Sequence, residues 1–228
     1  MTTGLFEYPK SAGFGRILPK NKIYEHGRPT SAVKELFVRQ VDQIVWQFKL
    51  SPETINLPRS RSVPEIQVFS MTLREEEIKR DVLRFMDLSI PYPIFFELCF
   101  EDQIKAVAAY KRPSEVDKTK WVLSDYFETS WLPKETPRKP LPILLNLELL
   151  YASLLTSLMP FPIRPGEELQ AFVARMELFR SRQKEMEKCE SRLKKEKQFN
   201  RKVRINSELL ELKREIKTLT SAFPNLST

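Results

Sequence analysis

The sequence is poor in the side chains from which most enzyme sites are built. Its 228 residues include one histidine, His26, and two cysteines, Cys99 and Cys189. A hydrolytic triad would have to use His26, which lies between proline and glycine residues, and the chain has no Gly-x-Ser-x-Gly motif. One histidine and two distant cysteines also give too few ligands for a zinc site. We therefore predict no catalytic residue, no metal site and no cofactor.

The sequence also gives no sign of secretion or of a membrane anchor. The two cysteines fall in different expected elements, which favours a reducing, cytoplasmic compartment. Residues 1–24 contain no continuous apolar stretch, so we expect no signal peptide. The longest apolar window, residues 141–163, is interrupted by proline and does not suit a membrane span. We expect no membrane partner.

Carboxylates are the remaining group that could support catalysis. A metal-dependent nuclease holds a divalent ion with acidic residues on adjacent strands, usually with a lysine close by. The residues that could form such a set are Glu65, Glu97, Glu101 and Asp102, with Lys105 or Lys111. Their spacing does not form a Glu-x-Lys strand motif, and polar residues at a chain turn explain Glu101 and Asp102 more simply. A nuclease is therefore an alternative hypothesis only.

Glycine and proline are absent from residues 167–223, a run of 57 residues. Its first half places apolar side chains at helical spacing, at Leu169, Phe172, Met176, Phe179, Met186 and Leu193. The phase changes near Phe199, which indicates either a stutter in one helix or a turn between two antiparallel helices. Asn206 or Ser207 could cap the second helix, which favours the hairpin.

The second half of the run follows an a/d spacing typical of a coiled coil. Such a seam has to be buried against another helix, either in a hairpin within one chain or between chains in a homo-oligomer. A structural adaptor or dimeriser that does not bind nucleic acid is thus a second hypothesis. Its predicted partner-binding residues are Ile205, Leu209, Leu212, Ile216 and Leu219.

Positive charge is concentrated in the same run. Residues 180–204 contain eleven Lys and Arg against four Glu, in a chain whose net charge is +8. Part of this charge falls in one arc of the helical wheel, opposite the apolar seam. Such a face is often only solvated, but it can also contact phosphates or an acidic partner. The predicted nucleic-acid-binding residues are Arg180, Lys184, Lys188, Arg192, Lys195, Lys197, Arg201, Lys202 and Arg204, together with Lys111 and Arg112.

Two of these basic segments also carry an aromatic side chain that could stack on a base. Tyr110 precedes Lys111 and Arg112, and Phe199 lies two residues before Arg201. Stacking on an aromatic ring tolerates any base, because every base has a π-face.

The fold class predicted for the whole chain is α+β, with a small mixed sheet and packed helices followed by a long, coiled-coil-like C-terminal helical hairpin or rod. Apolar periodicity predicts helices over residues 31–50, 75–88 and 144–159. It predicts strands over residues 55–57, 65–73, 94–100 and 104–110, and one strand or two short ones over residues 121–131. The expected divisions are an extended arm (1–29), an α+β domain (30–133), a proline-rich linker with a buried helix (134–166) and the basic helical region (167–223).

Several segments resemble a known family. They are residues 49–56 (KLSPETIN), 65–69 (EIQVF), 108–112 (AAYKR), 126–131 (YFETSW), 196–203 (EKQFNRKV) and 206–209 (NSEL). Together they resemble an uncharacterised bacterial and archaeal family, domain of unknown function 4391. Members of this family commonly accompany helicases and DNA methyltransferases in phage-defence and restriction-like loci. The resemblance implies an accessory role in DNA handling beside such an enzyme, and it supplies no catalytic residues.

The leading hypothesis is therefore a non-catalytic accessory subunit of a bacterial DNA-modification or phage-defence assembly. Its basic C-terminal helix would contact double-stranded DNA, a partner enzyme, or both. The sequence does not distinguish DNA from RNA.

Overall fold

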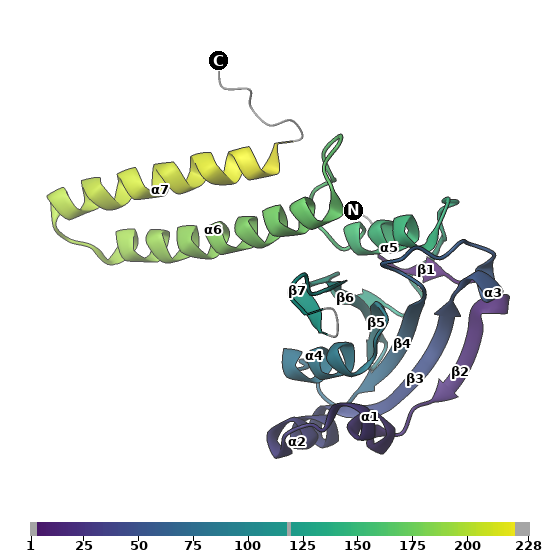
Figure 1. Cartoon of the computed structure of the whole chain (residues 1–228). Coiled ribbons are helices and arrows are strands. Elements are labelled where there is room, and N and C mark those ends of the chain that lie inside the picture. The colour runs from purple at the N-terminus through teal and green to yellow at the C-terminus, as the bar shows by residue number, and fades with distance from the viewer. Residues whose placement is uncertain (1–3, 118–119, 222–228) are drawn as a thin grey trace. The chain divides into compact units, whose positions relative to one another are not determined.

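The computed structural model describes residues 4–117 and 120–221, which form two compact units. Unit 1 comprises the described residues up to Leu158, and unit 2 comprises those from Met159 onward. The predicted mixed α+β class is confirmed (Figure 1). Residues 1–3 of the expected arm and residues 222–223 of the expected helical region lie outside the described part of the chain.

Unit 1 is built on a mixed sheet. Its strands lie in the order β2-β3-β4-β5-β6-β7, with the short β8 beside β6. Strands β4 and β5 are parallel and are connected through helix α4 (Arg80–Ser89), while the other neighbours are antiparallel. These strands are β2 (Gly13–Ile17), β3 (Val41–Leu50), β4 (Ile66–Leu73), β5 (Ile94–Phe100), β6 (Gln103–Pro113), β7 (Trp121–Glu128) and β8 (Leu132–Pro133). A separate parallel pair joins β1 (Phe6–Glu7) to β9 (Lys139–Pro140).

Helices from three parts of unit 1 share one core with the sheet. Ile23, Phe37 and Leu83, from α1, α2 and α4, are buried in the same cluster as the strand residues Phe96 and Val107. The helices of unit 1 are α1 (Lys20–Gly27), α2 (Ser31–Gln40), α3 (Pro52–Ile55), α4 (Arg80–Ser89) and α5 (Leu147–Thr156), with a 3-10 turn η1 (Lys10–Ala12). Burial of this apolar surface is the main stabilising term of the unit.

The central strands lie close to their predicted positions. Strand β4 begins at Ile66 and lies between β3 and β5, which explains why most of its residues are buried. Strands β5 and β6 form the predicted antiparallel hairpin, and Glu101 at its turn has a positive φ of 47°. The apolar helix expected near residue 150 is α5, capped by the Asn146 side chain, which accepts from the N–H of Leu149 at 2.9 Å.

The predicted helix over residues 31–50 is only half right. Helix α2 starts as expected, with the Thr30 hydroxyl accepting from the N–H of Val33, but it ends at Gln40. Residues 41–50 form strand β3, which pairs with both β2 and β4. The apolar spacing of this segment allows either a helix or a strand. Val41, Ile44 and Trp46 favour an extended chain, and hydrogen bonding of both edges of β3 to its neighbours decides for the strand.

Three other segments differ from expectation. The strand predicted over residues 55–57 is absent, because α3 runs to Ile55 and Asn56 then turns the chain with a φ of 54°. The helix predicted from Glu75 begins at Arg80. The segment expected as an extended arm instead supplies the edge strand β2 and helix α1, whose Ile23 is buried in the core.

Unit 2 contains two long helices that pack against each other (Figure 1). Helix α6 (Leu169–Lys195) and helix α7 (Phe199–Thr220) are joined by residues 196–198. The turn lies about eight residues before the predicted cap at Asn206 or Ser207, and those residues are inside α7. The two long helices confirm the helical region, whereas a coiled-coil register between them stays a prediction.

The cysteines and the helices bear on two further expectations. Both Cys99 and Cys189 are free thiols. Across residues 4–117 and 120–221, no helix combines the length and the apolar composition that crossing a bilayer requires.

Candidate nucleic-acid interface

The open end of the hairpin is closed by two arginines. Arg175 on α6 is buried and donates to the Glu167 carboxylate at 2.7 and 2.6 Å and to the carbonyl of Leu219 at 2.8 Å. Arg164 donates to the carbonyls of Thr218 and Ser221 at 2.6 and 3.0 Å. The hydrogen bonds from Arg175 hold the pKa of Glu167 below its usual value. Together the arginines satisfy carbonyls at the C-terminus of α7 that the helix itself leaves unpaired.

The two helices are then held together along their length. Cys189 of α6 is buried with Ile205, Leu209 and Leu212 of α7. Three ion pairs cross between the helices: Arg182–Glu215 at 2.7 Å, Arg192–Glu208 at 3.2 Å and Lys213–Glu190 at 3.5 Å. The apolar contacts carry most of the stabilisation, because exposed ion pairs contribute little.

The five residues predicted to bind a partner helix lie on this seam. Ile205, Leu209 and Leu212 are buried, and Ile216 and Leu219 are half-buried. The buried three pack within the hairpin, so helix α6 of the same chain supplies the second helix that their spacing requires.

The closed end of the hairpin is a tight turn organised by Glu196. Helix α6 ends where the N–H of Glu196 donates to the carbonyl of Arg192 at 3.0 Å. The Glu196 carboxylate accepts from the N–H groups of Gln198 at 2.9 Å and Lys197 at 2.8 Å. These bonds lower the pKa of Glu196 and direct its negative charge toward the backbone.

Positive charge is gathered at this closed end and is not spread along the hairpin. Residues 192–204, which we call the hairpin tip, contain seven Lys and Arg against the single Glu196, an excess of six. The two arms, residues 177–191 and 205–220, are balanced, with four and three charges of each sign. The arms contain the predicted residues Arg180, Lys184 and Lys188, and the other six predicted hairpin cations lie in the tip.

Most cations of the tip are exposed and have no acidic partner within residues 4–117 and 120–221. Arg192 pairs with Glu208. The others form no ion pair with a residue that the structure describes: Lys194, Lys195, Lys197, Arg201, Lys202 and Arg204. Lys194 is absent from the sequence prediction because it lies off the helical arc, although a local charge count includes it. Both helices contribute to a hollow in the tip, lined by Arg192, Lys195, Glu196, Arg201, Arg204 and Ile205.

Lys111 does not belong to a phosphate-binding surface. It lies on β6, is 3% exposed, and its ammonium donates to the carbonyls of Asp87 and Ile90 and to that of Tyr92 at 3.1 Å. The ring of Trp121 lies 5.0 Å from the ammonium. Lys111 therefore caps the C-terminus of α4, where a cation also meets the negative end of the helix dipole. Its neighbour Arg112 pairs with Glu115 at 3.2 Å.

The cap is part of a buried polar network. The hydroxyl of Tyr126 donates to the Asp87 carboxylate at 2.6 Å, and the Tyr151 hydroxyl bridges the N–H of Lys111 and the carbonyl of Ala109 at 2.8 Å each. Burial raises the pKa of Asp87 to about 7 and lowers the pKa of Lys111 to about 8. The network ties α4, β6, β7 and α5 together inside unit 1.

The carboxylates proposed for a nuclease are not assembled into a site. Glu97 is buried, and Arg138 donates to its two oxygens at 2.6 and 2.8 Å. Glu65 accepts from Gln67 at 2.7 Å and pairs with Lys49 at 3.2 Å. Within the described residues, no group of three or more His, Cys, Asp or Glu is placed to hold a metal ion.

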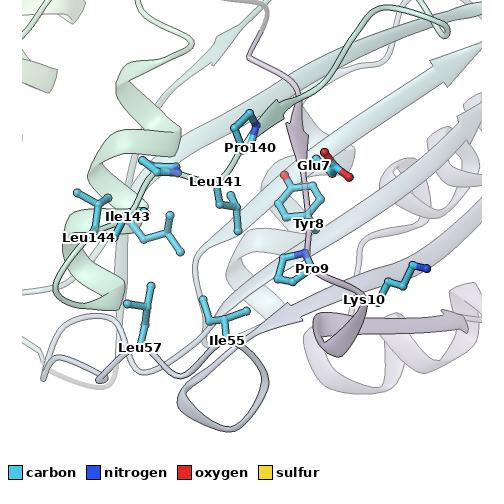
Figure 2. Close-up of a pocket in the computed structure, with 12 residues that line it drawn as sticks. Glu7, Tyr8, Pro9, Lys10, Ile55, Leu57, Pro140, Leu141, Ile143 and Leu144 are labelled. Carbon is cyan, nitrogen blue, oxygen red and sulfur yellow. The ribbon is translucent and has the colours of Figure 1, made fainter.

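Unit 1 has a hollow of a different kind, shown in Figure 2. Its wall is largely apolar, and its lining includes Tyr8, Ile55, Leu57, Leu141, Ile143 and Leu144, with Glu7 and Lys10 as the charged members. A phosphate there would lose its hydration without gaining an excess of cations, which is unfavourable. Of the two hollows, the one in the hairpin tip suits a polyanion.

Comparison with known proteins adds one finding. Neither the curated proteins nor the solved structures gave a match. A family model matches residues 6–216, so the match runs through the sheet of unit 1 and includes the whole hairpin tip of unit 2. The resemblance seen in the sequence is thereby confirmed, and the chain belongs to the family described as Domain of unknown function (DUF4391).

Proposed function

We propose that this protein is a non-catalytic accessory subunit that binds nucleic acid phosphates through its hairpin tip. The observation that carries the proposal is the excess of six positive charges in residues 192–204, between arms that are electrically balanced. Cations held this close repel one another, and a polyanion relieves the repulsion. Release of the counterions condensed on the nucleic acid then drives binding.

The association that the family resemblance implies extends this proposal. In a bacterial DNA-modification or phage-defence assembly, unit 1 would dock on a helicase or DNA methyltransferase. The tip would then contact the DNA on which that enzyme acts. The family match includes both units, so the basic tip belongs to the family's domain and is not an addition to it.

A coiled-coil adaptor is the weaker alternative. A homodimer through the a/d seam would have to open the hairpin, because Ile205, Leu209 and Leu212 are already buried against α6. Opening would also expose Cys189 and break the ion pairs between the helices. The free energy of that exposure counts against the dimer.

The test is binding of a labelled duplex oligonucleotide by fluorescence anisotropy at about 50 and about 200 mM NaCl. The variant Lys195→Glu/Arg201→Glu/Arg204→Glu reverses three tip cations that have no ion pair with a described residue. We expect its affinity at low salt to fall at least tenfold. The slope of log K against log salt should fall by about 3, since about one unit is lost per phosphate contact.

A matched control distinguishes the contribution of the tip cations to binding from the effect of the chain's net charge. The variant Lys184→Glu/Lys188→Glu/Lys217→Glu changes the net charge by the same amount, at exposed positions in the balanced arms. We expect it to weaken binding less than about threefold, through long-range electrostatics that salt screens. Equal losses in the two variants, or no binding of the native chain at low salt, would reject the tip as the nucleic-acid interface.

A further inference from the structure

The hairpin tip carries an exposed aromatic ring among its cations. Phe199 is the first residue of α7 and is 78% exposed. Val203, one helical turn later, is exposed too, and the two lie on the same side of α7. Leu210, two turns further along α7, is the next exposed apolar residue on that side. A phenylalanine exposed to this degree forgoes the free energy of burial that it would gain in a core.

Cations flank this ring in the sequence and share the hairpin tip with it. Lys197 and Lys202 lie within three residues of Phe199, and the hollow lined by Lys195, Arg201 and Arg204 opens at the same end of the hairpin. A ligand that uses both features must present negative charge and a flat apolar surface close together. An unpaired nucleotide has this combination, since its phosphate is anionic and both faces of its base are free.

A duplex does not offer the same combination. Its phosphates are accessible, but the base faces are stacked on one another, and a side chain reaches them only by unstacking a step at a cost of a few kcal/mol. An anionic membrane is the other surface that combines charge with apolar groups. A helix that lies in a membrane interface presents a broad apolar face, whereas the tip offers Phe199 and Val203 between seven cations.

We propose that the hairpin tip binds unpaired, single-stranded nucleic acid, with its phosphates on the tip cations and a base stacked on Phe199. This inference rests on the proposed function and adds the class of ligand that the tip selects. Base stacking contributes to single-strand binding, while the cations contribute to single-strand and duplex binding alike. The two contributions can therefore be removed separately.

The experiment compares the anisotropy of a labelled single-stranded oligonucleotide with that of its duplex for four single variants at one salt concentration. Phe199→Ala should weaken single-strand binding about tenfold and duplex binding less than twofold, because a stacked base is lost only in the first case. Phe199→Leu should behave like alanine, and Phe199→Tyr, which keeps the ring, like the native chain. Leu210→Ala removes an exposed apolar side chain from the same helix away from the tip and should change neither affinity.

Three outcomes would overturn the inference. If Phe199→Ala lowers both affinities equally or neither of them, the ring does not select unpaired bases, although loss of binding in the charge-reversal variant would still support the proposed function. If Phe199→Leu keeps native affinity, the contact is apolar and not a stack. If the chain binds phosphatidylcholine vesicles containing phosphatidylserine, and binds neither oligonucleotide, the ligand is a membrane and the proposed function falls as well.

Discussion

Lys111 and Lys195 illustrate two ways in which this chain uses a positive charge. Lys111 is buried under Trp121, and its ammonium donates to three carbonyls at the end of α4. Lys195 is exposed at the end of α6, in a tip with six other cations and one carboxylate. The buried cation completes the fold, whereas the exposed ones leave charge available to a ligand. Replacing Lys111 should therefore destabilise the fold, whereas replacing Lys195 should weaken ligand binding.

Replacing Lys111 should give the largest loss of stability. Lys111→Met keeps the apolar stem but leaves three buried or partly buried carbonyls without their donor, each worth about 1–3 kcal/mol. We expect the free energy of unfolding in urea to fall by about 3–5 kcal/mol. Arg112→Met is the matched control at the next position and should cost less than about 1 kcal/mol, because its partner Glu115 is exposed. Equal costs at the two positions would contradict the cap.

Arg175 tests whether a buried cation has the same role in the hairpin. Arg175→Met removes hydrogen bonds to Glu167, Leu219 and Pro162. It should destabilise the open end of the hairpin by about 1.5–3 kcal/mol, which is the range for hydrogen bonds to charged groups. Faster hydrogen exchange of the α7 amides is the measurement. Arg214→Met, at an exposed position on α7, should leave these exchange rates unchanged. Equal acceleration of exchange in both variants would argue against the contacts of Arg175.

The sequence predicts the tip better than it predicts individual cations. The local charge excess and the missing glycine and proline locate a basic helical region, because both are properties of composition. The burial of a side chain is not a property of composition, because it depends on which strands are neighbours in the sheet. Lys111 and Arg112 are adjacent in a basic segment, but only the pairing of β6 with its neighbours decides that Lys111 reaches the end of α4.

The same distinction applies to the elements of the fold. Strands β5 and β6 are predictable because Glu101 and Asp102 separate two apolar runs locally. The strand at residues 41–50 is not predictable in this way, because its apolar spacing also suits a helix. Long-range pairing with β2 and β4 makes the segment a strand. The hairpin turn is similar: three residues that favour no particular turn type end α6, and Glu196 organises them through backbone contacts.

Asp87 gives the buried network a pH dependence. Burial raises its pKa from 3.8 to about 7, so the folded state keeps a proton that the unfolded chain loses. Between pH 4 and pH 7 the folded state binds more protons, and stability therefore falls as pH rises, by an amount on the order of 4 kcal/mol. Asp87→Asn, which keeps an acceptor for Tyr126, should flatten this part of the profile of urea stability against pH. Asp81→Asn, at an exposed position on α4, should leave it unchanged, and a flat native profile would contradict the raised pKa.

Glu208 gives the smallest effect on folding and the clearest contrast with Lys111. Its carboxylate neutralises Arg192, the one tip cation with an ion pair to a described residue, and both side chains are about half exposed. Glu208→Gln should change the free energy of unfolding by less than about 0.5 kcal/mol, because exposed pairs contribute little. It also releases the charge of Arg192 to the tip, so nucleic-acid affinity at low salt should rise about twofold and the salt slope should steepen. Glu211→Gln makes the same charge change on α7, at an exposed residue that forms no ion pair with a described residue, and should raise affinity less. If the two variants raise affinity equally, net charge decides binding and the tip has no special part in it.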